Sequence, residues 1–512
     1  MIHRDISTVE PQRCGVFEIV MGRFNLLGLL FFSLFLCASA FELNAQDTIP
    51  DPGAARPVNV PAVKETKLKN GLTVAVVEKK GVPLVSVQLL VRAGASGEGM
   101  QKAGLANLTA DMLTKGTKTR TAEQIAEEME FLGSSLNSGA GWNNSTVGMT
   151  VTTDKLDAAM AVMSDVVLNP SFAQKELDLL KSQTLDELKY NLTQPGFLAS
   201  YVSAAWSYNE HPAGGTPASI ESIGRGDVEG FYKRFYGPKD SVLIFVGDIS
   251  QSAALKVAER SFGGWPVTAG GQRFDRLGDV VSKVIEEAPA YKRVLVVDLP
   301  NSGQSSVNYA VSISKLGRNT KDYYTASVLN SLLGGGYSSR LNQEIRIKRG
   351  LSYGAGSRFG WRDSVSTFGA STQTKDQSAA EVAELIVAEI DRLRTADPSN
   401  DELNPRKSVL TGGFGRNLET NAGLAGALAD LYAFGIPTSE LNAYVNNVNS
   451  VPSAALKSFA TRNFVNGDVI IVGDYSVFRD DLAKRFPNAR IEVVPAAELD
   501  ITQPNLRRRV EQ

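Results

Sequence analysis

The sequence predicts an α+β protein made of two homologous α/β sandwich domains, each of about 200 residues. Two observations carry this prediction. Short runs rich in branched residues alternate with long amphipathic segments, and the second half of the chain repeats the first in order and spacing. With 512 residues, of which 43% are hydrophobic, the chain is long enough to bury more than one core.

The alternation of strands and helices is clear in the first half. Residues 72–77 and 85–91 are rich in Val and Leu, which predicts strands. Residues 154–168 and 174–190 carry apolar side chains every three or four positions, which predicts two amphipathic helices. Pro170 separates these two helices.

The repeat places the same elements in the second half. Residues 147–154 lead into a helix much as residues 368–375 lead into a predicted helix at 378–394. The predicted strands 242–246 and 469–472 are each followed by Gly-Asp. Because the copies are offset by about 225 residues, we expect a repeat of one domain rather than a single long fold.

The repeat also predicts the domain limits, roughly 60–270 and 285–500. The Gly- and charge-rich residues 268–289 are the expected linker. The net charge of -2 provides no broad basic surface, so we expect no nucleic acid partner.

Residues 1–45 are typical of an export leader. Arg23 precedes an apolar run at 26–36, and small residues lead to a possible cleavage site after Ala40. The run is too short to cross a bilayer, which predicts an exported, periplasmic protein with no stable membrane span after cleavage. Translation from Met21 and an uncleaved anchor remain alternatives.

Cleavage would remove both cysteines. Cys14 and Cys37 lie in the leader, so the mature chain would hold no thiol. Disulfides and cysteine metal sites are therefore excluded for it.

Several stretches, in order, carry a resemblance to a known family. They are Val91-Arg92-Ala93-Gly94, Gly104-Leu105-Ala106, Phe231-Tyr232 and Leu333-Gly334-Gly335-Gly336-Tyr337-Ser338-Ser339-Arg340-Leu341. The layout resembles the pitrilysin/insulinase metallopeptidases (inverzincins), in the short-chain branch with the mitochondrial processing peptidase subunits. The resemblance implies that this chain forms half of a clamshell of four similar domains.

Active members of that family carry H-x-x-E-H directly after the Gly-Leu-Ala step. The chemistry needs two imidazoles to hold zinc and a carboxylate to take a proton from zinc-bound water. Here the three positions are Asn107, Ala110 and Asp111, a degenerate zinc motif. The chain has two histidines, and His3 precedes the leader's apolar run. No two-histidine site can therefore form within one mature chain, so no metal or other cofactor is expected on it.

Two further residues could serve as ligands. His211 lies in a predicted loop, and we expect an exposed or structural histidine there rather than a zinc ligand. Glu187 lies near the position where the family supplies its third ligand, although a solvated carboxylate on a helix is the simpler interpretation.

The second half retains a different pair. Arg346 and Tyr353 match the Arg/Tyr pair through which the resemblance implies substrate contact near the scissile bond. A guanidinium and a phenol can donate to a peptide carbonyl and to the oxyanion formed from it. The alternative is an arginine at a helix C-terminus followed by an ordinary strand tyrosine. Glycines 334–336 lack the Lys-Ser/Thr ending of a phosphate loop, so we expect them to permit close packing or substrate passage.

The resemblance implies a non-catalytic, substrate-contacting subunit of a heterodimeric zinc metallopeptidase that degrades or processes peptides. The partner subunit would carry zinc and H-x-x-E-H. A pseudoenzyme with a binding or scaffolding role is the alternative, and peptide hydrolysis by this chain alone is a third. The sequence leaves open whether two copies pair with each other.

Overall fold

The computed structural model describes residues 59–267, 293–503 and 505–508, all of which belong to one compact unit, Pro57–Gln512. The predicted leader at 1–45 and the predicted linker at 268–289 lie outside the described residues, as do Cys14, Cys37 and His3.

The first half forms a six-stranded sheet in the order β1-β2-β6-β3-β5-β4. Its central strands β2 and β6 are parallel, and the other neighbouring strands are antiparallel. All seven residues of β6 are buried, so the middle of the sheet is covered on both faces. The strands are β1 (Lys64–Lys67), β2 (Thr73–Glu78), β3 (Leu84–Val91), β4 (Asn137–Ala140), β5 (Ser145–Thr152) and β6 (Ser241–Gly247).

The second half repeats this sheet in the order β12-β7-β11-β8-β10-β9. Strand β7 is parallel to β11, as β2 is to β6, and the next three strands follow in the same antiparallel order. The strands are β7 (Arg293–Asp298), β8 (Gln304–Ser314), β9 (Ala355–Gly360), β10 (Val365–Lys375), β11 (Asp468–Gly473) and β12 (Arg490–Pro495). The predicted α+β class and internal duplication are therefore confirmed.

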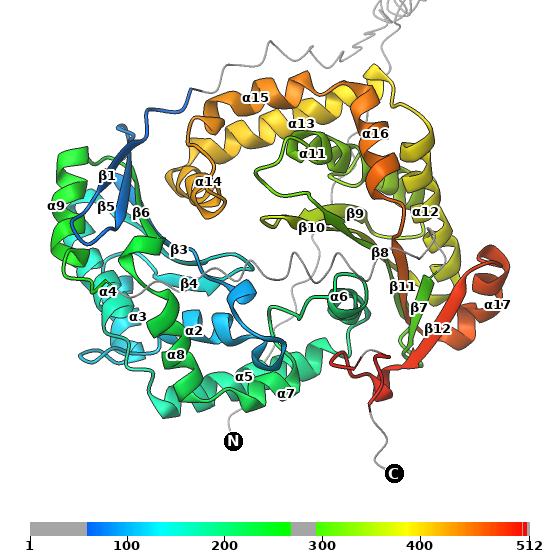
Figure 1. The fold of residues 1–512 in the computed structure, drawn as a ribbon, viewed down its shortest axis with the longest axis horizontal. Helices are drawn as coiled ribbons and strands as arrows, with labels where there is room; N and C mark the ends of the chain where they lie inside the picture. The colour runs from blue at the N-terminus through cyan, green and yellow to red at the C-terminus, as the bar shows by residue number, and fades with distance from the viewer. Residues whose placement is uncertain (1–58, 268–292, 504, 509–512) are drawn as a thin grey trace, which may run out of the picture. The chain divides into compact units, whose positions relative to one another are not determined.

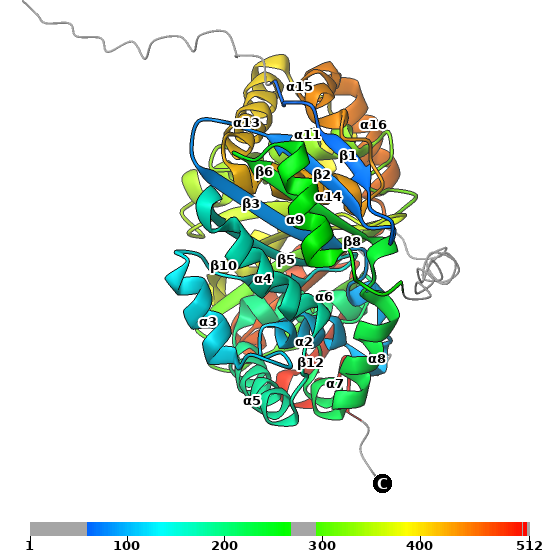
Figure 2. The same cartoon turned by 90° about the vertical axis from the view of Figure 1, so that its left-hand side faces the viewer.

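Equivalent helices follow equivalent strands. In the first half, α4 (Leu156–Leu168) follows β5 and contacts α9 (Gln251–Phe262) beside the sheet (Figure 2). In the second half, α12 (Ala379–Thr395) follows β10 and contacts α17 (Tyr475–Arg485). The other helices of the first half are α2 (Leu105–Leu113), α3 (Ala122–Phe131), α5 (Gln174–Asn191), α7 (Pro217–Ser222) and α8 (Arg225–Phe235). Those of the second half are α11 (Tyr323–Leu333), α13 (Asn400–Glu419), α15 (Glu440–Ser450) and α16 (Ser453–Asn463).

The two halves also exchange a helix. Helix α14 (Asn421–Ala433) belongs to the second half but packs on β3 and β6 of the first sheet, where Leu424 and Leu428 are buried. Helix α6 (Pro195–Trp206) belongs to the first half but packs on β8 and β11 of the second sheet (Figure 1). Each sheet thus has one face covered by the other half, so neither core is complete alone. The limits 60–270 and 285–500 stay a prediction.

The local predictions agree with the structure to within a few residues. Among the described residues, no helix has the length and apolar character needed to cross a bilayer.

Candidate functional site

Helix α2 carries the degenerate zinc motif, and a buried carboxylate caps its first turn. Gly104 precedes the helix with φ of 92°, a left-handed conformation that glycine adopts readily. The Glu98 carboxylate accepts hydrogen bonds from the backbone N–H groups of Gly104 (2.7 Å) and Ala106 (2.6 Å). Burial raises the pKa of Glu98 to about 8, although these donors favour the ionised form. Glu98 therefore satisfies helix donors that would otherwise be unpaired.

His211 packs beside this cap. Its Nε2 lies 3.2 Å from the carbonyl oxygen of Ala95 and its Nδ1 lies 3.4 Å from that of Pro212. Nδ1 is also 3.6 Å from the Glu98 carboxylate, and the ring lies 5.1 Å from that of Trp142. Burial lowers the pKa of His211, which favours the neutral ring. His211 is thus a buried structural histidine and is not exposed.

The three motif positions do not offer a zinc donor set. The Asn107 side chain donates to the carbonyl oxygen of Ala213 at 3.0 Å, and the Ala110 methyl is fully buried. Asp111 is half-buried, and burial raises its pKa while Lys115 opposes the shift. Zinc needs several nitrogen, sulfur or carboxylate ligands around one position. The three motif positions supply one carboxylate, one amide and one methyl group. The residues present do not fit the metal.

The rest of the described chain does not supply the missing ligands. Glu187 lies on α5, which contacts α2, but its side chain is exposed and no metal-binding role follows from its position. Over residues 59–267, 293–503 and 505–508, no group of three or more His, Cys, Asp or Glu side chains is placed to hold a metal ion.

The second half brings Arg346 and Tyr353, the pair implied by the resemblance, close together. Arg346 lies on a short π-helix, Asn342–Ile347, and Tyr353 lies in the loop before β9. The guanidinium carbon of Arg346 is 5.0 Å from the ring centroid of Tyr353 and 5.0 Å from that of Tyr337. Tyr353 is 91% exposed, so its hydroxyl is accessible to a ligand. The alternative of an ordinary strand tyrosine is wrong, because this residue precedes the strand.

Buried contacts hold this arginine between its two rings. The Asn342 side chain is buried, donates to the carbonyl oxygen of Tyr337 and accepts from the backbone N–H of Ala355 at 3.2 Å. Gly334 packs so closely on β9 that a Cβ there would lie 2.2 Å from the backbone nitrogen of Ser357. The close-packing expectation for this glycine is therefore confirmed. These contacts fix the loops that carry both tyrosines.

The neighbouring charges leave the Arg346 donors available. Glu344 pairs with Lys348 and, at 2.6 Å, with Arg349. No carboxylate of the described residues pairs with Arg346, whose guanidinium lies against the rings of Tyr337 and Tyr353. Contact with an aromatic ring does not use the N–H donors of a guanidinium, so they can still bind a carbonyl or carboxylate oxygen.

Sequence reasoning missed two residues of these sites. Glu98 has the sequence context of a surface acid in Gly97-Glu98-Gly99, and nothing local indicates that it caps α2, which begins at Leu105. Tyr337 directly follows the glycine run. An aromatic residue shortly before a basic segment is a signal for a ring–guanidinium contact.

Comparisons with known proteins agree on one family. Residues 73–213 match the family model described as insulinase (peptidase family M16), and residues 222–410 match the one described as the peptidase M16 inactive domain. An uncharacterized zinc protease of Rickettsia bellii is 29% identical over 296 residues, covering 57% of this chain and 68% of that protein. An uncharacterized zinc protease of Mycobacterium tuberculosis is 27% identical over 309 residues, covering 60% of this chain and 68% of that protein.

Solved structures share the fold over most of the chain. A peptidase M16 inactive domain from Pseudomonas fluorescens has a TM-score of 0.72 and 25% identity, covering 80% of this chain and 98% of that one. A protease from Helicobacter pylori has a TM-score of 0.71 at 19% identity, covering 81% and 100% respectively, which is a likeness in fold.

Proposed function

Because the chain belongs to the pitrilysin/insulinase (M16) peptidase family, we propose that it is the non-catalytic, substrate-contacting subunit of a heterodimeric zinc metallopeptidase that degrades or processes peptides. One observation carries this proposal. Arg346 is held between two exposed tyrosines with no carboxylate partner among the described residues, in a chain whose α2 positions do not fit zinc.

In the proposed assembly, zinc and the general base are on the partner subunit, in its H-x-x-E-H motif. The two chains together form a clamshell of four similar domains around a peptide-sized chamber. This chain would be exported to the periplasm by the leader at 1–45, and it would keep no membrane span after cleavage.

The chemistry assigned to this chain is binding and orientation. Arg346 can donate to the substrate carbonyl next to the scissile bond, and the exposed Tyr353 hydroxyl can add a second donor. As that carbonyl gains negative charge in the transition state, both hydrogen bonds strengthen, which lowers the barrier. The Tyr337 ring also contacts the guanidinium, whose carbon is 5.0 Å from the ring centroid.

Reconstitution tests the proposal. The purified chain, a partner chain that contains H-x-x-E-H, and their mixture are compared for bound zinc and for hydrolysis of a fluorogenic peptide. We expect hydrolysis by the mixture to exceed that of either chain alone, with zinc on the partner. Stoichiometric zinc and hydrolysis in this chain alone would overturn the proposal and support the third interpretation.

Substitutions separate substrate contact from scaffolding. In the mixture, Arg346→Ala should lower kcat/KM about 100-fold, since loss of one oxyanion donor costs about that much. Arg349→Ala is the matched control, because this arginine of the same segment already pairs with Glu344. If turnover is unchanged by Arg346→Ala and Tyr353→Phe, the chain is a scaffolding subunit.

A further inference from the structure

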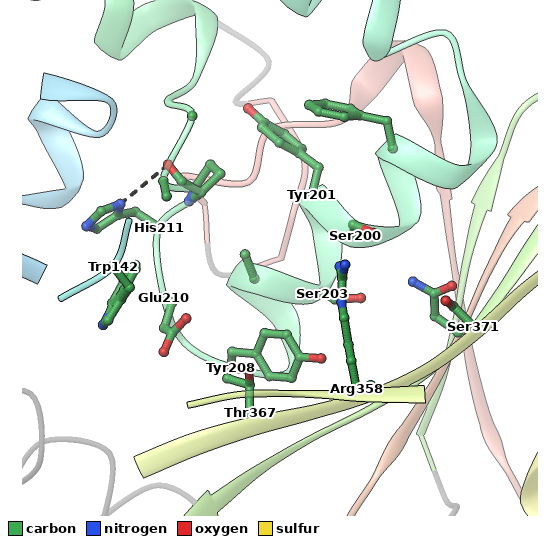
Figure 3. Close-up of a pocket in the computed structure, with 18 of the residues that line it drawn as sticks. Trp142, Ser200, Tyr201, Ser203, Tyr208, Glu210, His211, Arg358, Thr367 and Ser371 are labelled. Atoms are coloured by element: carbon green, nitrogen blue, oxygen red, sulfur yellow. Dashed lines mark hydrogen bonds between the residues drawn. The ribbon is translucent and has the colours of Figure 1, made fainter. Parts of the chain in front are cut away.

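A cavity of about 430 Å³ borders the α2 site, since His211 and Ala213 are among its lining residues, and neither Arg346 nor Tyr353 lines it. One wall comes from α6 and the loop that follows it, and the opposite wall comes from β9 and β10 (Figure 3). Its volume falls within the range of about 300 to 1,000 Å³ that is typical of small-molecule sites.

Glycines make the floor of this cavity. Arg358 lies opposite Gly369 in the pairing of β9 with β10, so both face the same side of the sheet. Gly356 and Gly360 are two residues before and after Arg358 on β9 and face that side too. A Cβ on Gly369 would lie 3.1 Å from the Tyr208 hydroxyl oxygen. Because these glycines have no side chains, the sheet face around the long cationic side chain of Arg358 is left open.

Hydrogen-bond donors converge in this hollow. The Arg358 side chain is exposed, forms no ion pair or hydrogen bond with the described residues, and rises from β9 toward α6 (Figure 3). Ser371 on β10 is paired with Asn308 on β8, so both also line this face. The Asn308 side-chain oxygen accepts from Ser306 at 3.3 Å, which leaves its amide N–H donors directed elsewhere. A guanidinium, a hydroxyl and an amide thus share one face.

The other ionisable groups of the cavity wall are neutral or compensated. Glu210 forms two hydrogen bonds with Arg362, at 2.9 and 3.3 Å, and Arg362 also stacks on Trp142 at 4.5 Å. His211 is buried, which lowers its pKa and favours the neutral ring. Among the described lining residues, Arg358 is therefore the uncompensated charge, and it favours an anion.

The remaining wall is apolar. Phe197 and Tyr201 of α6 stack with ring centroids 5.9 Å apart, and Leu188 lies beside them in the lining. The Tyr208 hydroxyl donates to the carbonyl oxygen of Phe368 at 3.1 Å, so its proton is already used. A ligand that fits must place an anionic group at Arg358 and an apolar group against the α6 side chains.

We propose that this cavity binds a carboxylate that carries an apolar or aromatic substituent. Arg358 pairs with the carboxylate, Ser371 and Asn308 donate to its second oxygen, and the substituent packs on Phe197, Tyr201 and Leu188. A planar guanidinium matches a planar carboxylate in a two-bond arrangement. The ligand is either a free acid or the C-terminal carboxylate of a peptide. This inference does not depend on the proposed subunit role.

Calorimetric titration of the full chain with N-acetylphenylalanine tests the proposal, and N-acetylphenylalaninamide is the neutral comparison. We expect saturable binding of the acid and at least about tenfold weaker binding of the amide, because charge-assisted hydrogen bonds are lost. Arg358→Gln should weaken binding of the acid about tenfold to 100-fold, and Arg358→Lys should restore part of the affinity.

Arg490→Gln is the matched control, since Arg490 is an exposed arginine on the other edge strand of the same sheet, paired with Glu492 at 2.8 Å. The affinity of the Arg490→Gln variant for N-acetylphenylalanine should equal that of the unmodified chain. The melting temperatures of all variants should agree. If N-acetyl-Ala-Ala-Phe binds more tightly than N-acetylphenylalanine, the site is assigned to peptide C-termini. If the two bind with equal affinity, the site is assigned to free acids. Absence of binding, equal affinity for acid and amide, unchanged affinity in Arg358→Gln, or tighter binding of phenyl phosphate overturns the proposal.

Discussion

The two halves build the same sheet but use the segment after its first long antiparallel strand in different ways. In the first half, β3 leads to α2, where Ala110 is buried and Glu98 caps the first turn from inside the protein. In the second half, β8 leads to α11, which is also buried, and then to the π-helix and the loop that carry Arg346 and the 91% exposed Tyr353. The helix after this strand is part of the core in both halves, and the second half adds an exposed binding surface before its edge strand β9.

The largest expected effect tests the premise that the halves are one unit. Leu428 of α14 is fully buried on the first sheet, so Leu428→Ala should lower the free energy of unfolding by about 3 kcal/mol. Urea unfolding followed by circular dichroism and by tryptophan fluorescence should give coincident transitions. Val409→Ala, at a position 46% exposed on α13, should change stability by less than about 0.5 kcal/mol. Two separated transitions would show that the halves unfold independently.

The next effect tests whether α2 has become core. Ala110→Glu restores the acid of the family motif at a fully buried position. We expect a loss of about 2 kcal/mol in the free energy of unfolding, measured in urea at pH 7. Asn107→His at the half-buried neighbouring position should cost less. Full stability of Ala110→Glu would mean that this helix face opens to solvent and can still accommodate a site.

A pH effect follows from the cap. Burial raises the folded-state pKa of Glu98 from 4.5 to about 8, so the folded protein binds more protons than the unfolded chain between these values and stability falls as pH rises. His211 has a lowered pKa and acts in the opposite direction, but only below its unfolded value of 6.5. Between pH 6.5 and 8, we therefore expect a net loss of about 1 kcal/mol.

Glu98→Gln should remove that loss, because an amide cannot titrate. Its unfolding free energy, measured at pH 6.5 and 8, should be nearly equal at the two values. Glu128→Gln is a matched control on the exposed face of α3 and should retain the slope of the unmodified chain. An unchanged slope in Glu98→Gln would place the titrating group elsewhere.

The local sequence pattern was sufficient to predict the helices and strands named above and the internal duplication. Apolar spacing predicted α4 and α5 because each buries one helix face within its own half, α4 against β5 and α9, and α5 against α2 and α7. The same spacing could not predict which sheet α6 and α14 cover. Both are apolar around much of their circumference, and their partners lie in the other half of the chain.

The candidate sites divide in the same way. Arg346 and Tyr353 lie only seven residues apart in one local stretch, so the resemblance of that stretch was enough to single out the pair. Glu98 and His211 are 113 positions apart in the sequence, and they are in contact only because the fold brings them together. Long-range contacts of this kind leave no periodic signal in a single sequence.

The smallest stability effect is expected where the binding surface is proposed. Tyr353 is 91% exposed and Tyr337 is 63% exposed, so truncating either ring removes little buried area. Tyr353→Ala and Arg346→Ala should each change the free energy of unfolding by less than about 0.5 kcal/mol, and their melting temperatures should match that of Arg349→Ala. This near-neutrality distinguishes the exposed Arg346 cluster from the buried motif positions of α2. A loss of 2 kcal/mol or more in either variant would show that the Arg346 cluster is itself structural, and the contrast between the two halves would then disappear.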